Sequence, residues 1–141
     1  MEPRVSMLGL GVFDLQKSVE FYQAGLGFPL APSSNENIAF FNLQNISLCL
    51  YPWDKLAEDA TVPSTGTGFR GVTIAHNVRT RDEVAEVLKL AEQAGGKIVK
   101  PAQDVFWGGH SGYFSDLDGH LWEVAYNPLA TLTDDGRLIF D

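Results

Sequence analysis

The chain has 141 residues, 45% of them hydrophobic, and a formal net charge of −8 at pH 7. This length fits a single domain or two small modules, and the apolar share is large enough for a real core. The acidic balance, with no cluster of lysine or arginine, argues against nucleic acid as a partner.

Two further features bear on the compartment. The only cysteine is Cys49, so the chain cannot form an internal disulfide framework. No apolar stretch approaches the roughly 18 residues that a membrane span needs, and the first residues do not resemble a signal sequence. We therefore expect a soluble, cytoplasmic protein with no membrane partner.

The first half of the chain predicts a strand, a helix and a hairpin. In Val5–Phe13, bulky and small residues alternate as they do in a strand. Asp14 is a suitable N-cap for the next segment, in which apolar residues recur at helical spacing. Ile38–Leu43 and Ile46–Tyr51 then predict two strands joined by a tight turn.

A polar segment separates this half from a second set of elements. Residues 54–68 are acidic and rich in glycine, threonine and proline, which is typical of a linker. Gly71–His76 predicts a strand, and Thr80 opens a helix with Glu83 three residues later, the spacing of a capping box. Ile98-Val99 predicts a further, short strand.

The stretch from Trp107 to Pro128 predicts a hairpin with a polar face. Its turn lies at Asp116–Gly119, where a three-residue loop with a bulge is favoured. This register places Tyr113 opposite Glu123. Because side chains alternate along strands, one face carries Ser111, Tyr113, Leu121, Glu123 and Ala125. The other face is bulky and apolar and suits packing beneath a helix; it carries Phe114, Trp122, Val124 and Tyr126.

The second half therefore runs strand, helix, strand, strand, strand, and the first half follows the same order with one strand fewer identified. The simplest interpretation is an α+β fold of two tandem βαβββ modules, at about residues 5–53 and 69–128, within a single domain. A tail at 129–141 follows, and we expect it to pack back on the body or on a partner.

Two motifs carry a resemblance to a known family. They are formed by Asp14-Leu15, Ser18 and Phe21-Tyr22 in the first half, and by Asp116, Asp118-Gly119 and Glu123 in the second. On these residues the chain resembles the vicinal-oxygen-chelate superfamily of glyoxalases, bleomycin-resistance proteins and extradiol dioxygenases. The resemblance covers about 120 residues, from Val5 to Pro128. It implies modules whose sheets curl into a cupped, partly open mixed β-barrel around a cavity, with helices outside, commonly in a homodimer.

Enzymes of this superfamily usually hold a divalent metal with four cavity side chains. The resemblance carries those places onto Met7, Leu48, Gly71 and Glu123. Only the last has a donor group that suits such a cation. We therefore expect no cofactor and no tightly bound divalent metal, and the metal-dependent lyase and dioxygenase mechanisms of the family lose their Lewis acid.

Three roles remain open for the polar face. The first is a metal-free binding protein in which Glu123 and Tyr113 floor a cavity for an apolar or cationic organic molecule. The second is a glyoxalase-like lyase or isomerase, or a dioxygenase, in which Glu123 is the general base or the sole retained metal ligand. The third is a structural carboxylate paired with a neighbour. Further candidate ligand contacts are Ser111, His110, Trp107, Trp53 and Phe41, although His110 faces away from Glu123 if the strand already includes it.

Overall fold

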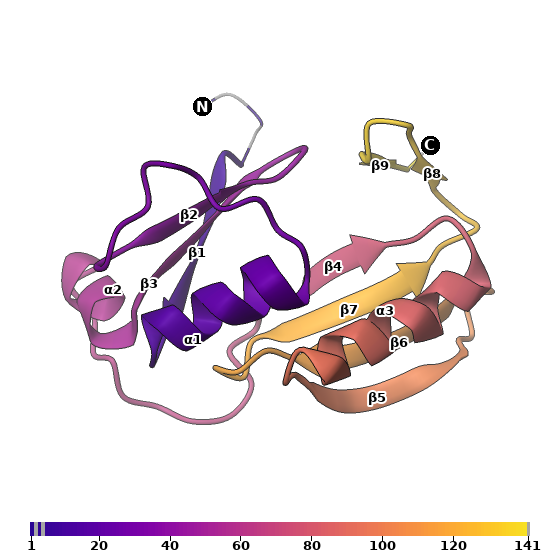
Figure 1. Ribbon diagram of the computed structural model, residues 1–141. Coiled ribbons are helices and arrows are strands. Elements are labelled where there is room, and N and C mark those ends of the chain that lie inside the picture. Colours follow the sequence, from indigo (N-terminus) through magenta and orange to yellow (C-terminus); the bar gives the residue numbers. More distant parts are fainter. Residues whose placement is uncertain (2, 4, 141) are drawn as a thin grey trace. The chain divides into compact units, whose positions relative to one another are not determined.

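The computed structural model describes residues 1, 3 and 5–140, and its backbone divides into two compact units. The first comprises Met1–Arg70 and the second Gly71–Asp141. Helices and mixed parallel and antiparallel sheets occur together, so the fold is α+β as the sequence predicts (Figure 1). Within the described residues the strands pair in separate sheets, and no closed barrel is found.

The first unit is a small mixed sheet with helices. Its sheet has the order β1-β3-β2, with β1 parallel and β2 antiparallel to β3. The elements in chain order are β1 (Met7–Val12), α1 (Leu15–Glu20), its π-helical continuation η1 (Phe21–Gly25), β2 (Ala39–Asn42), β3 (Ser47–Pro52) and α2 (Trp53–Asp59). The predicted N-cap is confirmed, because the Asp14 side chain accepts a hydrogen bond from the Lys17 backbone N–H at 3.1 Å. Helix α2 lies in the segment that the composition suggested to be a linker.

The core of the first unit lies on one face of its sheet. Leu8 pairs with Leu48 and Phe41 pairs with Leu48, so these side chains share a face. Phe41 is fully buried there, and its ring centroid lies 6.0 Å from that of Tyr22 on η1. This face is therefore packed beneath the first helix.

The second unit has the element order strand, helix, strand, strand, strand. Its sheet order is β4-β7-β6-β5, with β4 parallel to β7 and the other neighbours antiparallel. The elements are β4 (Ile74–Asn77), α3 (Arg81–Gln93), β5 (Lys97–Asp104), β6 (His110–Ser115) and β7 (Leu121–Tyr126). Two strands differ from the sequence prediction. The strand expected from Gly71 begins only at Ile74, since Gly71 has a φ of 77°, which a strand does not use, and β5 is longer than expected.

Helix α3 begins and packs as the sequence predicts. The Thr80 side chain accepts from the backbone N–H of Glu83, and the Glu83 carboxylate accepts from the Thr80 backbone N–H at 2.6 Å. These bonds lower the pKa of Glu83. The helix buries Val84, Leu88 and Ala91. Leu88 reaches the sheet directly above Gly112, on the face that also carries Phe114, Trp122 and Val124, so the apolar face of the hairpin lies beneath this helix.

The turn between β6 and β7 is the bulged loop that its residues favour. The Asp116 carboxylate accepts from the backbone N–H of Asp118 at 3.0 Å and of His120 at 2.8 Å. Gly119 has a φ of 86°, the left-handed conformation that the third loop position requires. The resulting register pairs Tyr113 with Glu123, as predicted.

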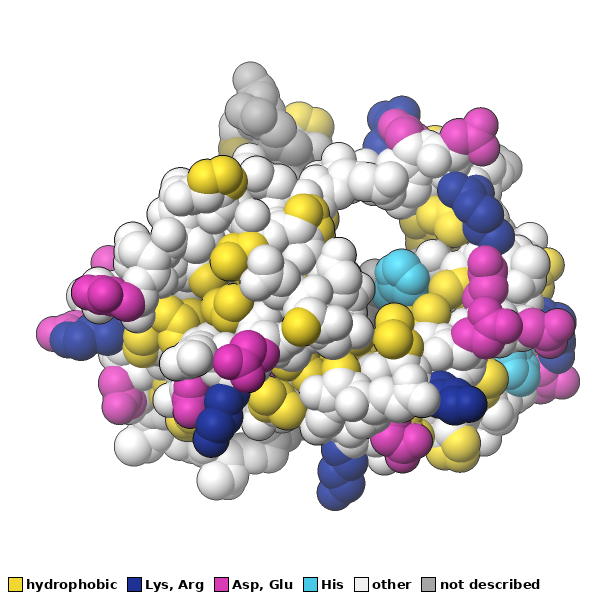
Figure 2. Space-filling model, viewed as in Figure 1, with side chains coloured by type: hydrophobic (Ala, Val, Ile, Leu, Met, Phe, Trp, Pro, Cys, Tyr) yellow, Lys and Arg dark blue, Asp and Glu magenta, His cyan; other side chains and the backbone are white. Residues whose placement is uncertain are grey.

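The surface carries mixed charges. Figure 2 shows acidic and basic side chains interspersed on the face in view, with no broad basic patch there among the described residues. Within the described part of the chain, none of the helices has the length and hydropathy required to cross a lipid bilayer.

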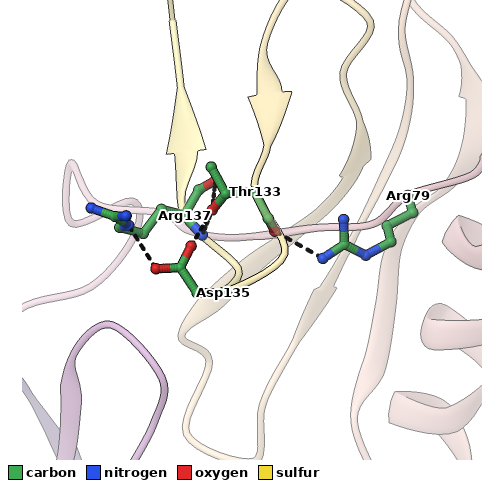
Figure 3. A network of polar contacts seen from close by, with 4 residues as sticks. All are labelled: Arg79, Thr133, Asp135 and Arg137. Atoms are coloured by element: carbon green, nitrogen blue, oxygen red, sulfur yellow. Dashed lines mark hydrogen bonds and ion pairs between the residues drawn. The ribbon is translucent and has the colours of Figure 1, made fainter.

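The last residues form a hairpin that is anchored by one arginine. Strands β8 (Thr131–Leu132) and β9 (Leu138–Ile139) pair antiparallel. The Arg79 guanidinium, just before α3, donates to the backbone carbonyls of Leu132 at 3.2 Å and Thr133 at 2.9 Å. Figure 3 shows the second of these bonds. A separate ion pair, Arg137 with Asp135, lies inside the hairpin.

We expect Arg79→Ala to loosen this hairpin, because the substitution removes both donors that bind its backbone. Hydrogen exchange followed by mass spectrometry should show faster exchange of the 131–139 amides. The matched control is Arg137→Ala, which removes an exposed ion pair of little energetic value. Equal protection in wild type and Arg79→Ala would show that this anchor does not hold the hairpin.

Candidate functional site

The centre of the candidate site is a pair of side chains on the face of the second sheet that α3 does not cover. Tyr113 on β6 and Glu123 on β7 are direct cross-strand partners, and Ala75 on β4 pairs with Glu123 from the other side. Both side chains are partly exposed. Ala75 itself is exposed.

The phenol and the carboxylate interact. Burial, the negative charge of Glu123 and a hydrogen bond to it all raise the pKa of Tyr113. The hydroxyl therefore stays protonated at neutral pH, so it can donate a hydrogen bond to the carboxylate or to a ligand oxygen.

Ser111 and Trp107 lie near Tyr113 on the face of the sheet that α3 does not cover. Ser111 is buried and precedes Tyr113 by two residues on β6, so both side chains point to the same face. The Trp107 ring occupies the space that a side chain at Gly109, the next position in this alternation, would fill: an added Cβ would lie 1.8 Å from a ring carbon. Gly109 thus leaves room for the Trp107 ring beside Ser111 and Tyr113.

His110 lies elsewhere. Strand β6 already includes it, so its side chain points to the face opposite Tyr113 and Glu123. Its Nδ1 lies 2.7 Å from Oδ1 of Asp104, which also forms an ion pair with Arg81. The hydrogen bond from His110 and the charge of Arg81 lower the pKa of Asp104. His110 therefore interacts with Asp104 near the start of α3, and the structure does not bring it together with the Glu123 carboxylate.

Two candidate aromatic residues belong to the first unit and lie on opposite faces of its sheet. Phe41 faces the helix-covered core, so its predicted place in a ligand wall is corrected to a packing role. Trp53 lies against Gly11, whose added Cβ would approach the indole to 3.1 Å, on the other face. Its ring stacks with Phe13 at 4.7 Å, and the Arg70 guanidinium lies 4.8 Å from its centroid. Trp53 is thus half-buried, whereas Phe41 is fully buried.

The positions carried over from the family's metal site do not form one here. In the β1–β3 ladder Leu48 pairs with Leu8, so Met7 and Leu48 point to opposite faces. Gly71 precedes β4, and the residue that pairs with Glu123 on that strand is Ala75. Among the described residues, no three His, Cys, Asp or Glu side chains gather as a metal ion would require. The residues present therefore do not fit the family's divalent metal.

The sequence did not predict one charged neighbour of the pair. Lys100 on β5 pairs with Tyr113, and its ammonium lies 5.9 Å from the centroid of the phenol ring. The predicted strand comprised only Ile98-Val99, so Lys100 was not placed beside the pair. Pro101 does not rule out a longer strand, because proline is tolerated in edge strands and at bulges. Strand β5 is an edge strand with bulges.

Comparison with known proteins agrees with this fold and with the motifs. The model of the Glyoxalase/Bleomycin resistance protein/Dioxygenase superfamily matches residues 4–124. A solved structure of a glyoxalase-related enzyme from Fulvimarina pelagi is 35% identical, with a TM-score of 0.88, over 98% of each chain. A glyoxalase/bleomycin resistance protein/dioxygenase from Nocardioides is 26% identical, with a TM-score of 0.72, over 89% of this chain and 84% of that one.

A more distant structure shares the fold alone. The lactoylglutathione lyase from Agrobacterium tumefaciens is 21% identical, with a TM-score of 0.68, over 92% of this chain and 97% of that one. The family model and the 35% identical structure span nearly the whole chain. The chain therefore belongs to the glyoxalase/bleomycin resistance protein/dioxygenase superfamily.

Proposed function

We propose that this protein binds a small organic molecule without a bound metal, at the face that carries Glu123 and Tyr113. The observation that carries the proposal is the Tyr113–Glu123 pair, which is partly accessible and flanked by Ser111 and the Trp107 ring. An accessible carboxylate beside an aromatic ring suits a ligand with an apolar body and a cationic or hydrogen-bond-donating group.

The superfamily fold extends this proposal to the rest of the chain. We propose that residues 1–141 form one domain of two tandem modules, whose sheets curl into a cupped, partly open mixed barrel, and that the protein is a homodimer. In such a barrel the face opposite the helices lines the cavity, which agrees with polar groups being placed there and apolar groups beneath α3. Light scattering should give about twice the mass of one chain.

The first test is Glu123→Gln, probed with phenethylammonium as an aromatic cation. The substitution keeps the shape of the side chain but removes its charge, so we expect affinity to fall at least about tenfold, or about 1.4 kcal/mol. The measurement is a titration followed by NMR. The control is Glu86→Gln, on the exposed side of α3. Unchanged affinity in Glu123→Gln would show that the carboxylate is structural.

A second function is a lyase or isomerase in which Glu123 moves a proton. Two observations favour it: the Fulvimarina pelagi relative is described as an enzyme, and Tyr113 stays protonated beside the carboxylate and can donate to a substrate carbonyl oxygen. In that reaction Glu123 would take a proton next to the carbonyl and Tyr113 would hydrogen-bond the resulting enolate. A dioxygenase role would need a metal, which the residues present do not fit.

Metal analysis of the purified protein, with native mass spectrometry, separates these functions. If the protein only binds a ligand, the metal content should be less than stoichiometric. Any small molecule that copurifies with the protein should be chemically unchanged. A stoichiometric divalent metal would overturn it.

A further inference from the structure

Two irregularities in strand β5 change which of its side chains lie opposite Tyr113 and Ser111. Ile98 pairs with Phe114, but Lys100 rather than Val99 pairs with Tyr113, and Gln103 pairs with Ser111. Each shift is a β-bulge, in which β5 has one residue more than β6. In a regular ladder from Ile98, Val99 would lie opposite Tyr113 and Pro101 opposite Ser111. The bulges therefore put an amine and an amide where the regular ladder would put two apolar side chains.

The bulged backbone of β5 fits against β6 only because residue 112 has no side chain. A Cβ at Gly112 would lie 2.8 Å from the Lys100 carbonyl oxygen, 3.0 Å from the Ala102 nitrogen and 2.6 Å from Leu88. Residue 112 must therefore be glycine for β5 to approach β6 in this way. Pro101 lies within the second bulge, between Lys100 and Gln103, where a missing N–H is tolerated. Local sequence on both strands supports the irregular path.

The consequence is a row of three functional groups across three strands. Lys100 on β5, Tyr113 on β6 and Glu123 on β7 are successive cross-strand partners. The Lys100 ammonium is positioned against the phenol ring, 5.9 Å from its centroid, and the phenol-bearing residue is the direct cross-strand partner of Glu123. Strands lie about 4.8 Å apart, so the backbones that carry the positive and negative ends are separated by roughly 10 Å.

We propose that Lys100 is a ligand-binding residue that recognises an anionic group, and that the ligand of this site is a zwitterion. The proposal rests on the function proposed above. A ligand that carries only a cation would be attracted by Glu123 but repelled by Lys100. A ligand that carries only an anion would be attracted by Lys100 but repelled by Glu123. A molecule that carries both charges, at opposite ends of an apolar body, satisfies both groups, and Tyr113 hydrogen-bonds between them.

Three matched probes test the charge requirement. 4-(2-Aminoethyl)benzoate carries an ammonium and a carboxylate at opposite ends of a ring; phenethylammonium has only the first charge and 4-ethylbenzoate only the second. Titrations followed by NMR should show that wild type binds the zwitterion at least about tenfold more tightly than either single-charge probe. Lys100→Gln should lose this preference and weaken the zwitterion and the anion about tenfold, while the cation binds equally or better.

Controls separate this inference from the function on which it rests. Lys100→Arg keeps the charge and should keep most of the affinity for the zwitterion, and Lys89→Gln, on the exposed side of α3, should change nothing. Glu123→Gln should weaken the zwitterion and the cation but not the anion. If Glu123→Gln has this effect and Lys100→Gln has none, the role of Lys100 is refuted and the binding function stands. If none of the probes binds, the zwitterion is refuted. If the zwitterion binds but neither substitution alters it, both proposals fail.

Discussion

Phe41→Ala is expected to lower the free energy of unfolding by about 3–5 kcal/mol, the usual cost of removing a fully buried aromatic side chain. The side chain is completely buried, and its ring packs against Tyr22 at 6.0 Å and Phe28 at 6.4 Å between centroids. Neither neighbour can fill the space left without breaking its own contacts, so a cavity remains. Urea denaturation followed by circular dichroism measures the change.

The control for this prediction is Phe106→Ala. Phe106 is fully exposed in the loop before β6, so the same truncation should change the free energy of unfolding by no more than about 0.5 kcal/mol. Binding of the aromatic probes should not change when Phe41 is truncated, as long as the protein is folded. A small stability loss with a large loss of affinity would restore Phe41 to the ligand wall.

The second large effect is expected from Gly112→Ala, which should lower the free energy of unfolding by about 1–3 kcal/mol because it overpacks the interface between β5, β6 and α3. The Leu88 side chain can rotate away, but the Lys100 carbonyl and the Ala102 nitrogen belong to the backbone and must move. Such a shift also disturbs the bulges that place Lys100, so we expect the zwitterion preference to decrease along with stability.

Gly9→Ala is the matched control. Gly9 is also within a strand, and nothing lies within 4 Å of an added Cβ there. That substitution should leave stability unchanged or raise it slightly, because alanine restricts the unfolded chain. If Gly112→Ala were as stable as Gly9→Ala, the backbone contact above Gly112 would not restrain β5.

Local chemistry decided what could be predicted from the sequence. The β6–β7 register follows from a turn whose aspartate and glycine act within a few residues, so Tyr113 was placed opposite Glu123 without knowledge of the fold. The caps of α1 and α3 were predicted for the same reason, since Asp14 and Thr80 bond to residues three positions away.

Features that depend on distant residues could not be predicted. The bulges in β5 rest on Gly112 and Leu88, which are separate in sequence from Lys100, so the lysine was missed. The orientation of Phe41 depends on which face α1 covers, and alternation alone gives two faces without saying which one is packed. Met7 and Leu48, onto which the family positions were carried, lie on opposite faces of the first sheet, because the pairing register of a strand cannot be placed to the residue from sequence alone.

The bulged path of β5 also affects how this protein behaves at high concentration. An outer strand with a straight ladder of unpaired amides is a template on which further chains can add and grow into fibrils. Here that strand carries a proline, two lysines and two breaks in its ladder, each of which hinders such growth. The device that positions Lys100 therefore also guards against self-association through this edge, and variants that straighten the strand should precipitate more readily.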